Sequence, residues 1–307
     1  LVFHFCNFIN GGTRGSVTPP LTSEGDIMQS NLLNTAVGRP VTLGRVMAVC
    51  GLAVAAYATP QYAAADYAFA NVGVQYLDWT DKTVSKTSHS GLGKKKSFPY
   101  MEIEGGIGGN WGDIYGFIDF ENPGKDPNNA ADPARDSRTA FKLVGRYKMA
   151  EVSGLPVMLY GRFYNFNDNG FTDQDRMLGL GTDVSAGKLS IKPFVAFRNE
   201  YKTNVSGKAN GGMIGFTASY PLQVLDKNVR LSWWHDTEFG RKDPLLVMAD
   251  GNGNRVTGSS VGHNGGIGAF YNINKQATAG ISYRYAYNKL GTVGLSDGLI
   301  YSLKYNF

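Results

Sequence analysis

The side chains best suited to binding or acid–base chemistry lie between Pro99 and Glu121. With a period of two, one face of this stretch carries carboxylates and aromatic rings, namely Tyr100, Glu102, Glu104, Asp113, Tyr115, Phe117, Asp119 and Glu121. An aromatic ring offers a flat apolar face to a planar base, and neighbouring charged groups hydrogen-bond sugar hydroxyls. A carboxylate pair such as Glu102 and Asp119 is also what a glycoside hydrolase uses.

The remaining reactive residue types argue against catalysis. The two cysteines, Cys6 and Cys50, both precede Asp66, so neither a metal cluster, a disulfide scaffold nor cysteine catalysis is expected. The four histidines show no metal-ligand spacing, and the sequence has no nucleophile elbow or phosphate-binding loop. Carboxylate pairs arise by chance on a surface dense with charges. We therefore expect no enzyme activity, no cofactor and no metal.

The elements that hold these side chains are predicted from the opposite face of the same stretch, which carries no charge. That face consists of Met101, Ile103, Gly105, Ile107, Ile114, Gly116, Ile118 and Phe120. Strict alternation on both sides of the short turn Asn110-Trp111-Gly112 predicts a β-hairpin. In a soluble sandwich the uncharged face is the core, whereas in a membrane barrel it faces lipid and the acidic face lines the lumen. One hairpin leaves both readings open.

The same alternation recurs along the chain and decides between them. We expect strands at Tyr67–Thr80, Pro99–Gly109, Asp113–Glu121, Arg138–Met149, Pro156–Phe166, Asp175–Ser185, Lys188–Tyr201, Asn210–Pro221, Lys227–Phe239, Val261–Ile273, Gln276–Leu290 and Ser296–Phe307. Their connections are alternately short and long, and apolar stripes end in Tyr or Trp, as in outer-membrane barrels. The sequence predicts an all-β fold, a transmembrane antiparallel β-barrel of about 12 strands.

Composition agrees with such a barrel and disfavours other classes. The 307 residues include 40 glycines and 12% aromatics, while mean hydropathy is only -0.22, as expected when half of each strand is polar. The net charge of +5 comes from interleaved acids and bases, which argues against a nucleic-acid-binding stripe. No run of ~20 apolar residues predicts a transmembrane helix. A soluble sandwich or a propeller is the alternative, but no blade-length repeat supports a propeller.

The amino-terminal region, residues 1–65, is predicted to be a leader outside the barrel. Arg39 and Arg45 precede the apolar run Val46–Ala58, and small residues follow it, which is typical of a secretory signal peptide at about residues 39–65. We place cleavage after Ala65, with Ala58 as the second choice. Residues before Met28 show no sustained period and are interpreted as mis-assigned leader sequence. The barrel domain is predicted at 66–307.

The predicted lumen is lined by opposed charges and rings. Besides the hairpin, it includes Lys142, Arg146, Arg162, Asp183, Lys192, Arg198, Glu200, Asp236, Glu238 and Arg284, with Tyr160, Tyr164, Phe194 and Trp234 between them. Twelve strands enclose more room than side chains fill, but less than a wide porin does. This lining suits a nucleoside better than an ion or a lipid. Two alternatives stay open: the charges only neutralise each other and stiffen the barrel, or the lumen is plugged and the protein is a structural or adhesin-like receptor barrel.

Three motifs resemble the nucleoside-specific outer-membrane channels of the Tsx family. They are PYMEIEGGIGGNWGDIYGFIDF at Pro99–Phe120, MLGLGTDVSAG at Met177–Gly187 and the ending KYNF at Lys304–Phe307. The resemblance implies a twelve-stranded monomeric barrel in the Gram-negative outer membrane that admits nucleosides and deoxynucleosides passively. By position, the first motif carries over Glu102, Glu104, Tyr115, Phe117 and Asp119, and the second carries over Asp183.

These observations give a predicted substrate-binding set. It consists of Tyr100, Glu102, Glu104, Tyr115, Phe117, Asp119, Arg146, Arg162, Asp183 and Arg198. The expected partners are nucleosides, outer-membrane lipid and lipopolysaccharide, and the assembly machinery that reads the carboxy-terminal strand ending at Phe307. The family also serves phages and colicins as a receptor, but the Pro/Gly/Asn-rich loops at Asn122–Asp136 and Gly240–Ser260 depart from its better-known members and leave that role unsupported here.

Overall fold

The computed structural model describes residues 65–88, 93–125, 137–168, 170–203, 205–224, 227–242, 247–250, 252 and 254–307. The predicted leader and signal peptide lie outside these residues. Within them, no helix is long and apolar enough to cross a membrane.

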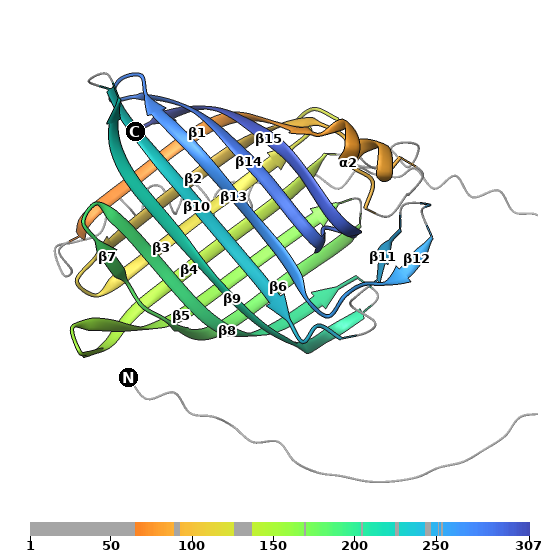
Figure 1. Cartoon of the computed structure of the whole chain (residues 1–307), viewed down its shortest axis with the longest axis horizontal. Helices are drawn as coiled ribbons and strands as arrows, with labels where there is room; N and C mark the ends of the chain where they lie inside the picture. Colours follow the sequence, from red (N-terminus) through yellow and green to blue (C-terminus); the bar gives the residue numbers. More distant parts are fainter. Residues whose placement is uncertain are drawn as a thin grey trace, which may run out of the picture. The chain divides into compact units, whose positions relative to one another are not determined.

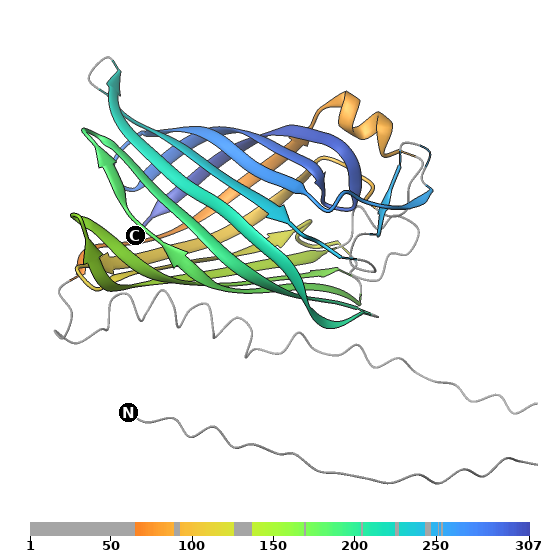
Figure 2. The ribbon, with the colours of Figure 1, turned by 60° about the horizontal axis from the view of Figure 1, so that its bottom comes forward.

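Twelve long strands form one closed antiparallel barrel (Figures 1 and 2). They are β1 (Ala65–Trp79), β2 (Phe98–Gly109), β3 (Gly112–Glu121), β4 (Arg138–Val152), β5 (Leu155–Asp168), β6 (Phe171–Gly181), β8 (Leu189–Lys202), β9 (Val205–Val224), β10 (Lys227–Phe239), β13 (Gly262–Asn272), β14 (Ala277–Lys289) and β15 (Thr292–Asn306). Each pairs with the next, and β15 pairs with β1 from Asn71↔Asn306 to Trp79↔Gly298. Closure leaves no free sheet edge, which is the condition for strands to cross a bilayer.

Alternation along each strand separates the lumen from the outer surface. In β8, Phe194, Ala196 and Arg198 are 8%, 4% and 2% exposed, whereas Val195 and Phe197 are 50% and 85% exposed. The same contrast runs around the barrel, so the outer surface carries a band of exposed apolar side chains. Such a band is stable against lipid and would be a liability in water.

The two ends of the barrel differ. One end, called the loop end here, carries the helix α2 (Asp81–Lys86) and the small hairpin of β11 (Val247–Ala249) and β12 (Arg255–Thr257), seen on the right of Figure 1. The other end, called the turn end, has short connections and the small strand β7 (Val184–Ala186), which pairs with β8. Outer-membrane barrels have short periplasmic turns and longer outer loops, so the loop end corresponds to the outer side.

Several predicted boundaries are wrong. β5 ends at Asp168 rather than Phe166 and β6 begins at Phe171 rather than Asp175, so most residues between the two predicted strands belong to strands. β9 begins at Val205 rather than Asn210, and β15 begins at Thr292 rather than Ser296. In β6 and β9, residues that are mostly polar or small continue the ladder at the loop end, because backbone pairing with a neighbour does not require an apolar side chain. In β15 the outward apolar alternation itself extends back through Leu295 and Val293. The helix α2 and the β11–β12 hairpin lie in segments predicted to be plain loops.

One glycine is required where the predicted hairpin turns. Gly112 has a φ of +129°, and a Cβ there would lie 1.9 Å from the carbonyl oxygen of Arg146. The turn thus brings β3 against β4 with no room for a side chain. This close approach sets the register that pairs Asp113 with Arg146 across the two strands.

Candidate functional site: the barrel lumen

Side chains of the β2–β3 hairpin form a hydrogen-bonded layer inside the barrel. The Tyr115 hydroxyl donates to Glu104 Oε2 at 2.9 Å, and the Tyr100 hydroxyl donates to Gln75 Oε1 at 3.1 Å. Lys304 Nζ lies 2.8 Å from Glu102 Oε1 and 2.5 Å from Glu104 Oε1. Since β1 lies between β2 and β15, this lysine ties both glutamates across the closing seam of the barrel.

Next to this layer, one lysine faces three aromatic rings. Lys142 Nζ lies 5.0 Å from the ring centroid of Phe117, 5.6 Å from that of Trp234 and 5.9 Å from that of Tyr115. These are cation–π distances. Lys142 forms no ion pair with another residue in the described part of the chain. We call Lys142, Tyr115, Phe117 and Trp234 the Lys142 cluster. It joins β3 and β4 to β10 across the lumen.

At the loop end, one arginine is enclosed by carboxylates. Arg198 lies 2.7 Å from Asp175, 2.8 Å from Glu200 and 3.2 Å from Glu238, measured between guanidinium nitrogens and carboxylate oxygens. The side chain of Arg198 is 1% exposed. We call these four residues the Arg198 cluster. Lys202, Lys289 and Arg241 add further cations to its rim.

Carboxylate oxygens of Asp173, Asp175 and Glu200 approach one another within 4.8 Å, as metal ligands do. Their neighbours do not suit a metal ion. Arg198 binds both Asp175 and Glu200, and Lys202 binds Asp173 and Glu200. The carboxylates are thus already neutralised by side-chain cations, and the group is better described as an ion-pair network.

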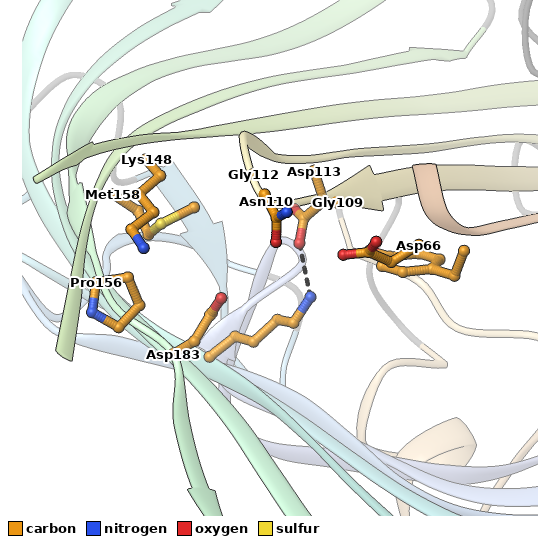
Figure 3. Close-up of a pocket in the computed structure, with 11 residues that line it drawn as sticks. Asp66, Gly109, Asn110, Gly112, Asp113, Lys148, Pro156, Met158 and Asp183 are labelled. Atoms are coloured by element: carbon orange, nitrogen blue, oxygen red, sulfur yellow. Dashed lines mark hydrogen bonds and ion pairs between the residues drawn. The ribbon is translucent and has the colours of Figure 1, made fainter. Parts of the chain in front are cut away.

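At the turn end lies a cavity of about 240 Å³, lined by residues that include Asp66, Asp113, Asp183 and Lys192 (Figure 3). Asp113 lies on its wall and accepts from Lys192 Nζ at 2.6 Å, the pair marked by the dashed line in Figure 3. Arg146 contacts both Asp113 and Asp183, so it links β3 and β4 to the connection after β6. Asp183 is 38% exposed at its side chain and borders the cavity.

The structure places all ten predicted site residues in or at the mouth of the lumen, but it does not bring them to one place. Glu102, Glu104, Tyr100 and Tyr115 are neighbours in one layer. Asp119 is close to them and has a buried Oδ1 with no hydrogen-bond partner in the described part of the chain. Arg146 and Asp183 belong to the turn end, whereas Arg198 belongs to the loop end.

Some lumen residues that complete these groups were not among the predicted site residues. Lys304 lies on the last strand, and its alternation with apolar neighbours showed only that it faces inward. Asp175, Lys289 and Arg241 complete the Arg198 cluster from three other parts of the chain. The alternation in the sequence predicted that Asp175 points inward. Its partners depend on how the barrel closes and on how far neighbouring strands are offset, and no local sequence pattern specifies either.

A closed antiparallel barrel with an apolar outer band and a charged lumen is a transmembrane barrel of the Gram-negative outer membrane. A family model described as "Nucleoside-specific channel-forming protein, Tsx" matches residues 74–307. The chain therefore belongs to the Tsx family of channel-forming proteins, and the predicted resemblance is confirmed. A channel family implies a transporter rather than an enzyme.

Several solved structures are similar to this chain over most of its length. A bacterial polysaccharide outer membrane secretin has 9% identity and a TM-score of 0.39, over 78% of this chain and 98% of that chain. The outer membrane channel DcaP of Acinetobacter baumannii has 11% identity and a TM-score of 0.35, over 81% and 99%. A Pseudomonas aeruginosa FadL homologue has 9% identity and a TM-score of 0.34, over 79% and 90%.

Proposed function

We propose that this barrel lets nucleosides and deoxynucleosides diffuse passively across the outer membrane, and that the Lys142 cluster contacts the base. The carrying observation is the set of three rings, Tyr115 and Phe117 on β3 and Trp234 on β10, around a cation that has no described ion partner. Stacking of a base on an aromatic ring contributes about 1–3 kcal/mol and tolerates different bases. A planar base can displace the ammonium from a ring face without breaking a salt bridge.

Polar groups next to the rings are suited to the sugar. The Oδ1 of Asp119, which has no hydrogen-bond partner among the described residues, can accept a hydrogen bond from a hydroxyl. Glu102 and Glu104, which Lys304 holds in the same layer, are further acceptors. Tyr100 belongs to the same layer, and the remaining predicted residues, Arg146, Arg162, Asp183 and Arg198, form the polar path on either side of it. Passive flow needs binding that is strong enough to favour entry and weak enough to permit exit. The monomeric state, lipopolysaccharide contact and the role of Phe307 in assembly stay predictions.

Single-channel conductance in planar bilayers tests the proposal. The protein purified from outer membranes should show a small conductance that adenosine or thymidine reduces in a saturable way. The substitution Trp234→Leu should weaken this block about tenfold, because losing about 1.4 kcal/mol of stacking energy lowers the affinity tenfold. Trp233→Leu is the matched control because Trp233 is adjacent in sequence, faces outward and is 43% exposed.

Each other outcome has a distinct meaning. Conductance that ignores nucleosides would reject the proposed selectivity and leave a general pore. Absence of any conductance would favour the plugged structural barrel. Equal loss of block in both tryptophan variants would show that the effect comes from barrel stability rather than from the lumen.

A further inference from the structure

One ion pair runs across the lumen rather than along the wall. Arg162 Nη1 lies 2.7 Å from Asp236 Oδ2, and the two side chains are 10% and 7% exposed. Arg162 belongs to β5 and Asp236 to β10, and β6, β8 and β9 separate these strands in the sheet. A contact over that many strands cannot follow the wall, so the pair bridges the interior.

Neighbouring side chains extend this bridge into a layer. Arg162 Nη1 also lies 3.4 Å from Met213 Sδ on β9. Trp234, two residues before Asp236 on the same inward face, meets Lys142 from β4 at 5.6 Å. Two independent contacts thus span the lumen from β4 and β5 to β10 at adjacent levels. This layer lies between the cavity at the turn end and the Arg198 cluster at the loop end.

The chemical groups of Arg162 and Asp236 determine which solutes can bind the two side chains in place of their ion pair. Parting two buried ions is costly unless each regains a hydrogen-bonding partner. The Nε of Arg162 is buried and has no hydrogen-bond partner in the described part of the chain, so the guanidinium keeps a donor for an incoming acceptor. A solute with hydroxyl groups can donate to the Asp236 carboxylate and accept from Arg162 at the same time. An apolar solute can do neither, and a small ion can compensate only one partner.

We propose that Arg162 and Asp236 are the specificity-determining constriction of this channel, a removable bridge that parts for uncharged solutes bearing both hydrogen-bond donors and acceptors. This inference rests on the proposed function as a channel and names the two residues that select the solute class. The bridge acts on ions as well, because each half left alone presents an uncompensated charge in a narrow passage.

The test compares charge-removing variants in potassium chloride without nucleoside. Asp236→Asn and Arg162→Gln should each raise single-channel conductance, by about twofold or more, because the bridge is broken. Reversal potentials in a salt gradient should shift in opposite directions, toward anions in Asp236→Asn and toward cations in Arg162→Gln. The double variant should keep the raised conductance and return ion selectivity toward that of the wild type. The charge-exchange variant, which combines Arg162→Asp with Asp236→Arg, should form the pair again and restore low conductance.

A second ion pair serves as the matched control. Arg138 and Glu121 lie 2.7 Å apart and are 13% and 15% exposed, but they sit opposite each other on adjacent strands, β3 and β4. Arg138→Gln and Glu121→Gln should leave the conductance near the wild-type value because this pair follows the wall.

Three results would overturn the inference: unchanged conductance in both single variants, selectivity shifts of the same sign, or equal conductance increases in the control variants. Nucleoside block is recorded in the same experiment. Wild-type block that persists beside unchanged variant conductance would reject the bridge alone, whereas altered conductance without any nucleoside block would reject the proposed substrate and keep the bridge. If a single variant does not assemble, the charge exchange, which retains a pair, still reports on the bridge through its conductance.

Discussion

The Arg198 cluster and the Lys142 cluster line the same lumen, yet their cations have different surroundings. Arg198 meets three carboxylates, whereas Lys142 meets three ring faces and no carboxylate among the residues that the structure describes. A cation with a full set of ion partners holds strands together. A cation whose partners are rings can be displaced from them at low cost. The number of charges alone therefore does not separate residues that stabilise the barrel from those proposed to bind solute, whereas the partners of each charge do.

The strongest test of this comparison removes the enclosed cation. Arg198→Met should destabilise the barrel by about 3–5 kcal/mol, because it leaves buried carboxylates uncompensated. The measurement is urea unfolding of the protein in lipid vesicles. Arg176→Met on β6 is the control, since Arg176 is exposed and contacts Gln174 rather than a carboxylate. A change below 1 kcal/mol in Arg198→Met would show that Lys202, Lys289 and Arg241 suffice for the cluster.

A ring of the Lys142 cluster should behave in the opposite way. Phe117→Ala should weaken nucleoside block about tenfold through lost stacking while the barrel still assembles. Phe120→Ala, on the outward face of the same strand, should leave block unchanged. The readout is the nucleoside concentration that halves the single-channel current. An unchanged value in Phe117→Ala would remove this ring from the proposed site.

A smaller effect is expected at Tyr115, which makes both a ring contact and a hydrogen bond. Tyr115 belongs to the ring cluster, but its hydroxyl also donates to Glu104 at 2.9 Å. Tyr115→Phe keeps the ring and loses one hydrogen bond, a change of about 1 kcal/mol in unfolding free energy. Nucleoside block should be close to wild type. Block weakened as much as in Phe117→Ala would mean that the hydroxyl, rather than the ring, contacts the solute.

The smallest expected effect concerns the loop end and depends on pH. Burial, helped by the nearby cations Arg138 and Arg284, lowers the pKa of Lys95 to about 7. Lys95 Nζ donates to the Leu290 carbonyl at 2.6 Å, which holds residues 93–97 against the β14–β15 turn. In the unfolded chain the pKa is ~10.4, so the destabilisation from burying this lysine is complete below pH 7 and is relieved as pH rises from 7 to about 10.

Ion selectivity should report this titration. As pH falls through 7, Lys95 gains a positive charge at the mouth of the lumen, and cation permeability should drop by less than about twofold. Lys95→Gln should flatten the profile between pH 6 and 8. A pH profile identical to wild type in this variant would assign the titration to another group.

The sequence was sufficient for the fold because alternation is a local property. Val195, Phe197 and Leu178 face outward and Phe194 and Arg198 face inward as their parity predicts, since successive side chains of a strand point to opposite faces. The extent of the strands was harder to predict. β6 and β9 continue through polar residues toward the loop end, where backbone pairing persists without an apolar stripe.

The sequence predicted which side chains of the candidate site point inward, but not which of them contact one another. Glu102, Tyr115 and Phe117 were predicted to line the lumen, and they do lie together. The pairing of Arg162 with Asp236 was not predicted, because it depends on which strands face each other after closure. Parity shows that a residue points inward, but the stagger of the whole barrel decides what it meets.

Lys304 has a further consequence for the timing of assembly. It joins the last strand to Glu102 and Glu104 on β2, and the seam beside it joins residues more than 200 positions apart, such as Asn71 and Asn306. Contacts so distant in the chain form late, because the entropy of closing the loop must be met first. The two glutamates therefore stay hydrated and repel each other until the last strand pairs with the first. The seam then closes in one late step. Because Lys304 neutralises both carboxylates in that step, reopening the seam is unfavourable.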